Sequence, residues 1–340
     1  MFSMMRRLYF LLPGTDGRFA CGGLWAELKT VNLVREFCSA EVVTYRQKES
    51  GKLFLDDLLQ EKILNNLDDV IFVISWGFDV AKLAAKLQRY NVIYHAHSAG
   101  YKIDLPSNIP IITVSRNTLG YWGQKSPNSL IYYLPNQISE EFTNLDQSRD
   151  IDVLVQTRKS SQYLIKSLIP ALKKKCHVLV VDSYVENLPV LFNRAKIYLY
   201  DSAEYWQLQG VSEGFGLQPM EALACGCHVF SSVNGGLSDY LDPGFNCYKI
   251  AGYALEYDLA KILQVLEATT LPTLSATVLT EYRKENIIER LKVILSEIND
   301  FFDHKNHYST KIPDLTKIQL AQLFVERIFA KIQKKYLQGN

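Results

Sequence analysis

Short apolar runs alternate with longer amphipathic segments along the first 135 residues. Their nearly continuous hydrophobicity predicts strands that are buried on both faces, as in a parallel sheet. Between some of these strands, residues 23–37 and 78–90 carry helical periodicity. The predicted strands are Leu8–Leu12, Glu41–Tyr45, Val70–Ser75, Val92–His97, Ile111–Ser115 and Leu130–Pro135.

A second alternating set follows the polar, patternless stretch 136–150, which we interpret as a linker. Helical patterns lie at 163–174, 219–224 and 255–267. We therefore expect two doubly wound α/β domains, residues 1–140 and 141–312, with a ligand cleft between them beyond the carboxyl ends of the strands. The predicted strands of the second domain are Asp152–Gln156, His177–Asp182, Lys196–Asp201, His228–Ser232 and Cys247–Ile250.

Two glutamates, Glu213 and Glu221, stand with seven residues between them in a glycine-containing stretch. We expect a loop up to Gly216 and then a helix with Pro219 at its first position, which would put Glu221 in the first turn. Free N–H groups at a helix start favour a phosphate, and carboxylates on either side would accept hydrogen bonds from sugar hydroxyls. Spacing alone also allows Glu221 to be a capping residue and Glu213 to be solvated.

The segment "EGFGLQPMEALACG" resembles the Glu-x7-Glu motif of retaining glycosyltransferases of the GT-B fold, family 4 in particular. The continuation "CHVFSSVNGGLSDYL" resembles the strand, Gly-Gly turn and short helix of that family. Weaker similarities are "CGGLWAEL" to its N-terminal glycine loop, "ITVS" to an interior strand and "LPNQISEEF" to its interdomain linker. The resemblance implies two Rossmann-like domains facing a cleft and a hexosyltransferase-like enzyme (EC 2.4). Such an enzyme moves a sugar with retention from a nucleotide-diphosphate sugar to a hydroxyl acceptor.

The same resemblance assigns roles to individual residues. Glu213 would contact the donor sugar as a catalytic residue, and Glu221 would hold the ribose. The diphosphate would lie on the backbone of Phe215, Gly216 and Leu217. In the first domain, Gly22 and Gly23 would open a helix that approaches the phosphate or the acceptor. No cofactor and no metal are expected.

Arg158 and Lys159 follow the first strand of the second domain, where the cleft should be. Two cations there can neutralise a departing diphosphate without a metal. The family usually separates its Arg and Lys by a few residues, whereas here they are adjacent, which leaves the role of Lys159 open. The alternative is an ordinary pair of surface charges.

His95 and His97 share one face at the end of a predicted strand. A metal pair is one interpretation, but no third ligand is apparent in the sequence. The resemblance places His97 near the acceptor as a catalytic residue, and the alternative for both is a buried structural histidine. Tyr205 and Trp206, in an approach to Glu213 that is longer than in the family, would stack on a sugar or base, or cover the core.

Composition narrows the setting of this chemistry. Lys plus Arg (37) nearly balance Asp plus Glu (36), so general nucleic-acid binding is not indicated. No apolar run reaches the roughly 18 residues of a membrane span. The six cysteines lack disulfide-like spacing, and Cys225 and Cys227 suggest buried thiols more than a zinc site. We therefore expect a cytoplasmic location, with membrane association as an option.

The C-terminal stretch 313–338 has an amphipathic helical pattern. The resemblance implies that it packs back on the first domain. The competing interpretation is a peripheral membrane contact through a helix with Lys331, Lys334 and Lys335 near its end, suited to a lipid-linked acceptor. Glycans, glycolipids and small molecules all remain as acceptors. Two other functions stay open, namely a sugar-nucleotide epimerase of the GT-B fold and a non-catalytic binding protein.

Overall fold

Seven parallel strands form the first sheet of the computed structural model, which describes residues 5–60, 67–75, 77–268, 276–307 and 315–337. The sheet order is β3-β2-β1-β4-β5-β6-β7. All six predicted strands are present, and only the two-residue β3 was not predicted. The strands are β1 (Arg7–Leu12), β2 (Ala40–Thr44), β3 (Leu53–Phe54), β4 (Val70–Ile74), β5 (Asn91–Ala96), β6 (Ile111–Thr113) and β7 (Ile131–Tyr133).

Helices cover both faces of this sheet, which explains why its strands are almost wholly apolar. On one face, apolar side chains of α2 (Leu55–Gln60), α3 (Val80–Lys86) and α4 (Arg116–Lys125) join those of the strands in one buried cluster. On the other face, Leu8 of β1 lines a small cavity together with Val34 of α1 (Gly22–Arg35) and Leu291 of α11 (Lys284–His307).

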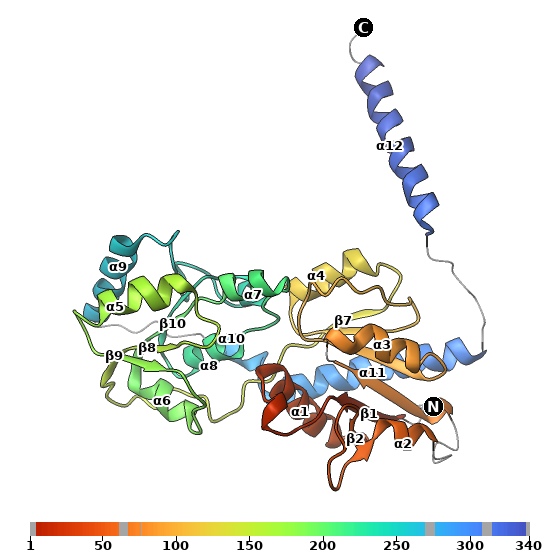
Figure 1. The fold of residues 1–340 in the computed structure, drawn as a ribbon, viewed down its shortest axis with the longest axis horizontal. Coiled ribbons are helices and arrows are strands. Elements are labelled where there is room, and N and C mark those ends of the chain that lie inside the picture. The colour runs from red at the N-terminus through yellow and green to blue at the C-terminus, as the bar shows by residue number, and fades with distance from the viewer. Residues whose placement is uncertain (1–4, 61–66, 76, 269–275, 308–314, 338–340) are drawn as a thin grey trace. The chain divides into compact units, whose positions relative to one another are not determined.

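Five parallel strands form the second sheet, in the order β12-β11-β10-β8-β9. One face is covered by α6 (Leu188–Arg194) and α8 (Leu217–Ala224). The other is covered by α9 (Leu255–Glu267) and by a π-helical turn, Leu164–Leu168, that continues into α5 (Ile169–Leu172) (Figure 1). The strands are β8 (Ile151–Gln156), β9 (Val178–Val181), β10 (Ala195–Tyr200), β11 (His228–Ser231) and β12 (Tyr248–Lys249).

Shorter elements complete the described chain. Two of them are α7 (Ala203–Gln209) and α10 (Ala276–Thr280). Short 3-10 helices lie at Gly17–Phe19, Leu67–Asp69, Gly77–Asp79 and Gly235–Asp239. The two parallel sheets with helices on both faces confirm the two doubly wound α/β domains that the sequence predicted.

The first part of α11 returns to the first sheet, although its residues fall in the range predicted for the second domain. Asn299 accepts hydrogen bonds through Oδ1 from the main-chain N–H of Arg6 at 3.3 Å and from its guanidinium at 3.0 Å. Lys284 forms an ion pair with Glu36 of the first domain at 2.7 Å. Residues 284–300 thus tie the end of the second domain to the first.

The chain divides into a compact unit of residues 1–300 and a smaller unit of residues 301–340. The smaller unit contains α12 (Lys317–Leu337), whose described side chains are exposed, including those of Ile318, Phe324 and Phe329. Packing of 313–338 on the first domain stays a prediction, and residues 313, 314 and 338 lie outside the described ones. No described helix is both long and apolar enough to cross a membrane.

Candidate functional site

The candidate site lies where the connections of the second sheet diverge. From β8 the chain runs to β9 on one side, and then crosses to β10 on the other side of β8. Ligands of doubly wound sheets bind at such a switch point, beyond the carboxyl ends of the strands. Lys159 follows β8 and Ser202 follows β10, so both lie at this edge.

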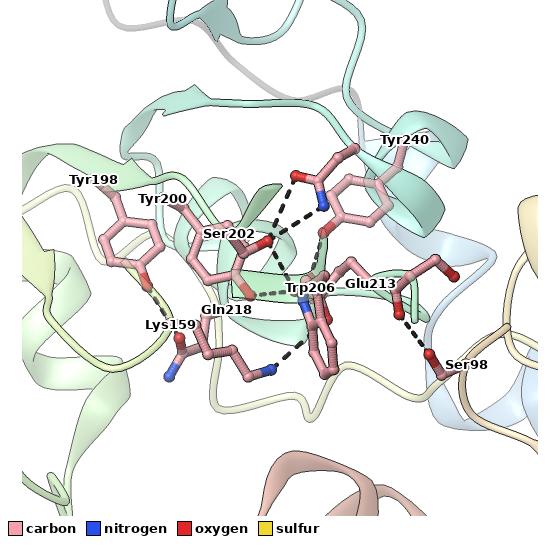
Figure 2. A network of polar contacts seen from close by, with 12 residues as sticks. Ser98, Lys159, Tyr198, Tyr200, Ser202, Trp206, Glu213, Gln218 and Tyr240 are labelled. Carbon is pink, nitrogen blue, oxygen red and sulfur yellow. Dashed lines mark hydrogen bonds and ion pairs between the residues drawn. The ribbon is translucent and has the colours of Figure 1, made fainter. Parts of the chain in front are cut away.

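Glu213 occupies this edge as a buried carboxylate held by three donors. Its Oε2 accepts hydrogen bonds from the Tyr200 hydroxyl at 2.5 Å, the Ser202 hydroxyl at 3.1 Å and the Trp206 indole N–H at 2.6 Å. Figure 2 shows these side chains gathered around Glu213. Burial beside the Glu213 carboxylate raises the pKa of Tyr200 well above its usual range, so Tyr200 remains a donor. One carboxylate oxygen is therefore fully engaged by the protein.

Trp206 belongs to α7, a helix inside the stretch that we had predicted to be loop. The expectation that Trp206 stacks on a sugar or covers the core does not describe its main contact, because its indole N–H binds Glu213. The Lys159 ammonium lies over the Trp206 ring, 4.4 Å from the ring centroid. Tyr205 is 37% exposed and packs edge-to-face on Trp206. Trp206 is thus part of the support of Glu213.

Of the two predicted cations, the structure brings Lys159 to the glutamate. Its Nζ lies 3.7 Å from Oε1 of Glu213, the oxygen that the three donors leave free. Lys159 has a positive φ of 71°, a conformation that residues other than glycine rarely adopt. The Arg158 side chain is exposed, and the described residues give it no ion-pair partner.

Glu221 is also buried, yet it lies in a different environment. Helix α8 begins at Leu217, so the expectation of Pro219 at its first position was wrong, and Glu221 lies in the second turn. Within the described chain no group donates a hydrogen bond to its carboxylate. Burial raises the pKa of Glu221 to about 7, although the charge of Lys29 acts in the opposite direction. Glu221 therefore does not cap the helix start, and the described chain leaves its carboxylate without a donor.

The segment between the two glutamates requires glycine for close packing. A Cβ on Gly214 would lie 1.6 Å from the carbonyl oxygen of His97, and Gly216 has φ of +79° at the start of α8. The Phe215 side chain is buried against the rings of Tyr240 and Tyr282, so only its backbone can face a ligand. Leu217 is the first residue of α8, whose initial N–H groups lack helical partners.

Hydrogen bonds anchor this segment to both domains. Ser212 exchanges main-chain contacts with the first domain, donating its N–H to the Ala99 carbonyl at 2.9 Å and accepting from the Ser98 hydroxyl. On the other side, the Glu213 carbonyl accepts from the N–H of Gly236 at 2.8 Å. The first domain therefore helps to fix the position of Glu213.

In the first domain, His95 and His97 share Glu27, a residue that the sequence analysis missed. Oε2 of Glu27 lies 2.6 Å from Nδ1 of His95 and 2.7 Å from Nε2 of His97. Burial raises the pKa of Glu27, but the two imidazoles outweigh it and hold the value at about 2. Burial and His95 together lower the pKa of His97. The available signal was the place of Glu27 between Leu24 and Val31 on the buried side of α1, where apolar residues are expected.

The remaining predicted residues are two glycines of the first domain and two cysteines of the second. Gly22 and Gly23 are the first residues of α1, and a Cβ on Gly22 would meet nothing within 4 Å, whereas one on Gly23 would lie 3.9 Å from the Cys21 thiol. Cys225 and Cys227 are buried, and burial raises the pKa of each thiol to about 12. The Cys227 thiol donates to the carbonyl oxygen of Phe192 at 3.1 Å.

Comparison with known proteins adds a family similarity over part of the chain and a fold. Residues 135–275 match the family model described as Glycosyl transferases group 1. No curated protein sequence matches the chain.

Three solved structures are similar to this chain over most of its length. Anabaena Alr3699/HepE, in complex with UDP and glucose, is 14% identical with a TM-score of 0.60, over 86% of this chain and 100% of the other. A glycosyltransferase from Rickettsia africae is 11% identical with a TM-score of 0.63, over 86% and 98%. The pneumococcal O-GlcNAc transferase GtfA, in complex with UDP and GlcNAc, is 12% identical with a TM-score of 0.61, over 87% and 99%. The chain therefore has the GT-B fold, and its second domain is similar to group 1 glycosyltransferases.

Proposed function

We propose that the protein is a retaining glycosyltransferase that moves a sugar from a nucleotide-diphosphate sugar to a hydroxyl acceptor. The observation that carries the proposal is the pair of buried carboxylates Glu213 and Glu221 on either side of the start of α8. The family match over residues 135–275 and the UDP complexes of two similar structures support it. The same comparisons make UDP the first nucleotide to test.

In this proposal each group has one task. The ribose hydroxyls donate to Glu221, whose carboxylate has no donor within the described chain. The diphosphate accepts hydrogen bonds from the N–H groups of Phe215, Gly216 and Leu217. The donor sugar meets the free Oε1 of Glu213, while Oε2 stays bound to Tyr200, Ser202 and Trp206.

Charge develops on the diphosphate as the bond to the sugar breaks. We assign its stabilisation to Lys159, which is already near Glu213, and to Arg158, whose exposed side chain can reach toward the ligand. A metal ion on the diphosphate is then not required. The acceptor approaches from the first domain, near His97 and the helix start at Gly22 and Gly23.

The experiment is a thermal-shift panel of nucleotide sugars, followed by an acceptor panel in buffer without added Mg²⁺ or Mn²⁺. The proposal expects one nucleotide sugar to raise the unfolding midpoint. It also expects release of the nucleoside diphosphate to depend on an acceptor, with the anomeric configuration retained by NMR. If no nucleotide sugar raised the midpoint, the proposed donor site would be contradicted. A midpoint shift without acceptor-dependent release of the nucleoside diphosphate would instead indicate a non-catalytic binding protein.

A GT-B epimerase is the second candidate, because it would use the same donor contacts at Glu213 and Glu221. It would release a free sugar without any acceptor. Chromatography of the products formed from donor and protein alone separates the two enzymes. The glycosyltransferase proposal expects little free sugar there and a new glycoside once the acceptor is added. A cytoplasmic location stays a prediction. Membrane association stays an option, which liposome flotation can test.

A further inference from the structure

The cluster of Glu27, His95 and His97 lies outside the donor contacts just described. One ligand atom from each residue comes within 4.8 Å of the other two, and the three come from two different elements. Glu27 stands on α1, whereas His95 lies in β5 and His97 directly follows that strand. The fold thus brings Glu27 into contact with His95, which is 68 positions away in the sequence, and with His97, which is 70 positions away.

Hydrogen bonding in the cluster is incomplete. The Glu27 side chain is 1% exposed, and no lysine or arginine in the described chain forms an ion pair with it. Its second oxygen, Oε1, is buried without a hydrogen-bond partner, as is Nε2 of His95. A buried polar atom without a partner is costly, so the cluster can still gain from a bound ligand.

We infer that Glu27, His95 and His97 form a binding site for a divalent transition-metal ion, with Zn²⁺ as the reference ion. Two imidazoles and one carboxylate are a ligand set that suits zinc. Mg²⁺ and Ca²⁺ prefer oxygen ligands, so a site with two imidazole nitrogens should bind them less well. The ligands would be Oε2 of Glu27, Nδ1 of His95 and Nε2 of His97.

The required geometry is a small change from that observed. Neighbouring ligands of a tetrahedral ion with bonds of about 2.0 Å lie about 3.3 Å apart. The two contacts of Oε2 are at 2.6 and 2.7 Å, so a movement of the Glu27 carboxylate by about half an ångström makes room for the ion. Each histidine already presents the required nitrogen to the centre of the cluster.

The surroundings of His97 determine how an ion would reach the site and which segment it would stabilise. Its side chain is 15% exposed, whereas those of His95 and Glu27 are nearly inaccessible, so the open fourth position faces the His97 side. The carbonyl of His97 packs against Gly214, next to Glu213. A bound ion would therefore fix the segment from which the first domain contacts the donor loop. This site is separate from the diphosphate, and its existence does not depend on the proposed function.

The test uses the full chain without a histidine tag, after dialysis against a chelator. Co²⁺ is the probe, because tetrahedral Co²⁺ gives intense visible absorption between about 500 and 650 nm that the hydrated ion lacks. We expect this absorption to saturate at about one equivalent and to disappear on addition of Zn²⁺. Absence of a saturable band in the wild-type protein would overturn the inference even if no variant folded.

Variants locate the ion. We expect His97→Ala to weaken Zn²⁺ binding at least about tenfold in competition titrations, as the loss of a ligand should. His177→Ala is the matched control, since His177 lies in the second domain at an exposed position. Equal Zn²⁺ affinity in wild type and His97→Ala would place the ion elsewhere and contradict the assignment. Comparison of unfolding midpoints in chelator separates loss of the site from loss of the fold.

Discussion

Glu213 and Glu221 are both buried carboxylates of one loop-and-helix segment, but the protein treats them in opposite ways. Glu213 has three hydrogen-bond donors on one oxygen and a lysine near the other. Glu221 has no donor in the described chain, and burial raises its pKa to about 7. The first carboxylate is placed before any ligand arrives, whereas the second is left in an environment that disfavours its charge.

This difference indicates different roles for Glu213 and Glu221. A carboxylate whose position is fixed by Tyr200, Ser202 and Trp206 is suited to orient a reacting sugar, because orientation must exist before the reaction. A carboxylate that lacks donors gains most from ligand hydroxyls, because they satisfy a group that is costly to leave buried and unpaired. The predictions below break or sharpen this contrast.

The largest effect should come from Gly214→Ala, which displaces the loop that carries Glu213. The added Cβ would lie 1.6 Å from the carbonyl oxygen of His97, so the backbone must shift. A misplacement of about 1 Å costs on the order of 100-fold in turnover. Gly120→Ala is the control, because a Cβ there meets nothing within 4 Å. Steady-state transfer rates measure the effect, and near-normal turnover of Gly214→Ala would refute the tight packing of this loop.

Glu221→Gln should change stability in a pH-dependent way. The pKa of Glu221 in the folded protein is about 7, above the usual glutamate pKa of 4.5. The ionised form therefore destabilises the fold, and this cost appears as pH rises from about 4.5 to 7. Between pH 5 and pH 8, the free energy of unfolding of the variant should gain about 2 kcal/mol relative to wild type. Urea unfolding at both pH values measures it, with Glu289→Gln, an exposed position, as control. A difference independent of pH would show that Glu221 is not desolvated.

Trp206→Phe should lower kcat/KM about tenfold, because Glu213 loses one donor of a charge-assisted hydrogen bond. The fall should appear mainly in kcat, since the nucleotide contacts are unchanged. Tyr205→Phe keeps the packing on Trp206 and should remain near wild type. If the two variants behaved alike, Trp206 would be covering the core and not positioning Glu213.

Lys159→Gln should have the smallest effect of the four, about fivefold to tenfold in turnover, corresponding to about 1 kcal/mol. Arg158→Gln should lower turnover less, because the Arg158 side chain is exposed and Lys159 already lies 3.7 Å from Glu213. Rates measured at saturating donor compare them. A larger effect at Arg158 would mean that its side chain moves to the diphosphate when the donor binds.

Much of the fold could be predicted because its strands are apolar on both faces. A run such as Val70–Ile74 must bury both of its faces, and the interior of a parallel sheet covered by helices allows this. The strand β3 escaped prediction because two residues carry no periodicity. Helix α7 escaped because it was assigned to the loop that precedes the glutamates, and none of its residues is buried.

The candidate site was predictable only where residues lie close in the sequence. Glu213, Glu221 and the loop between them form one segment. The donors Tyr200 and Ser202 belong to the preceding strand and its end, and their contact with Glu213 depends on how the chain turns. Glu27 is 68 residues from His95, so the contact becomes visible only when α1 is packed on the sheet. Pro219 misled because proline is tolerated anywhere in the first turn, where its missing N–H has no helical partner.

The central claim is that Glu221 binds the ribose of a nucleotide donor, and calorimetry can test it directly. The measurement compares the nucleoside diphosphate that binds best with its 2′-deoxy and 3′-deoxy counterparts, in wild type and in Glu221→Ala. The account predicts that loss of the contacted hydroxyl weakens binding to wild type about tenfold or more, and that the variant binds the ribose and deoxyribose forms equally. Equal discrimination by wild type and variant would contradict it.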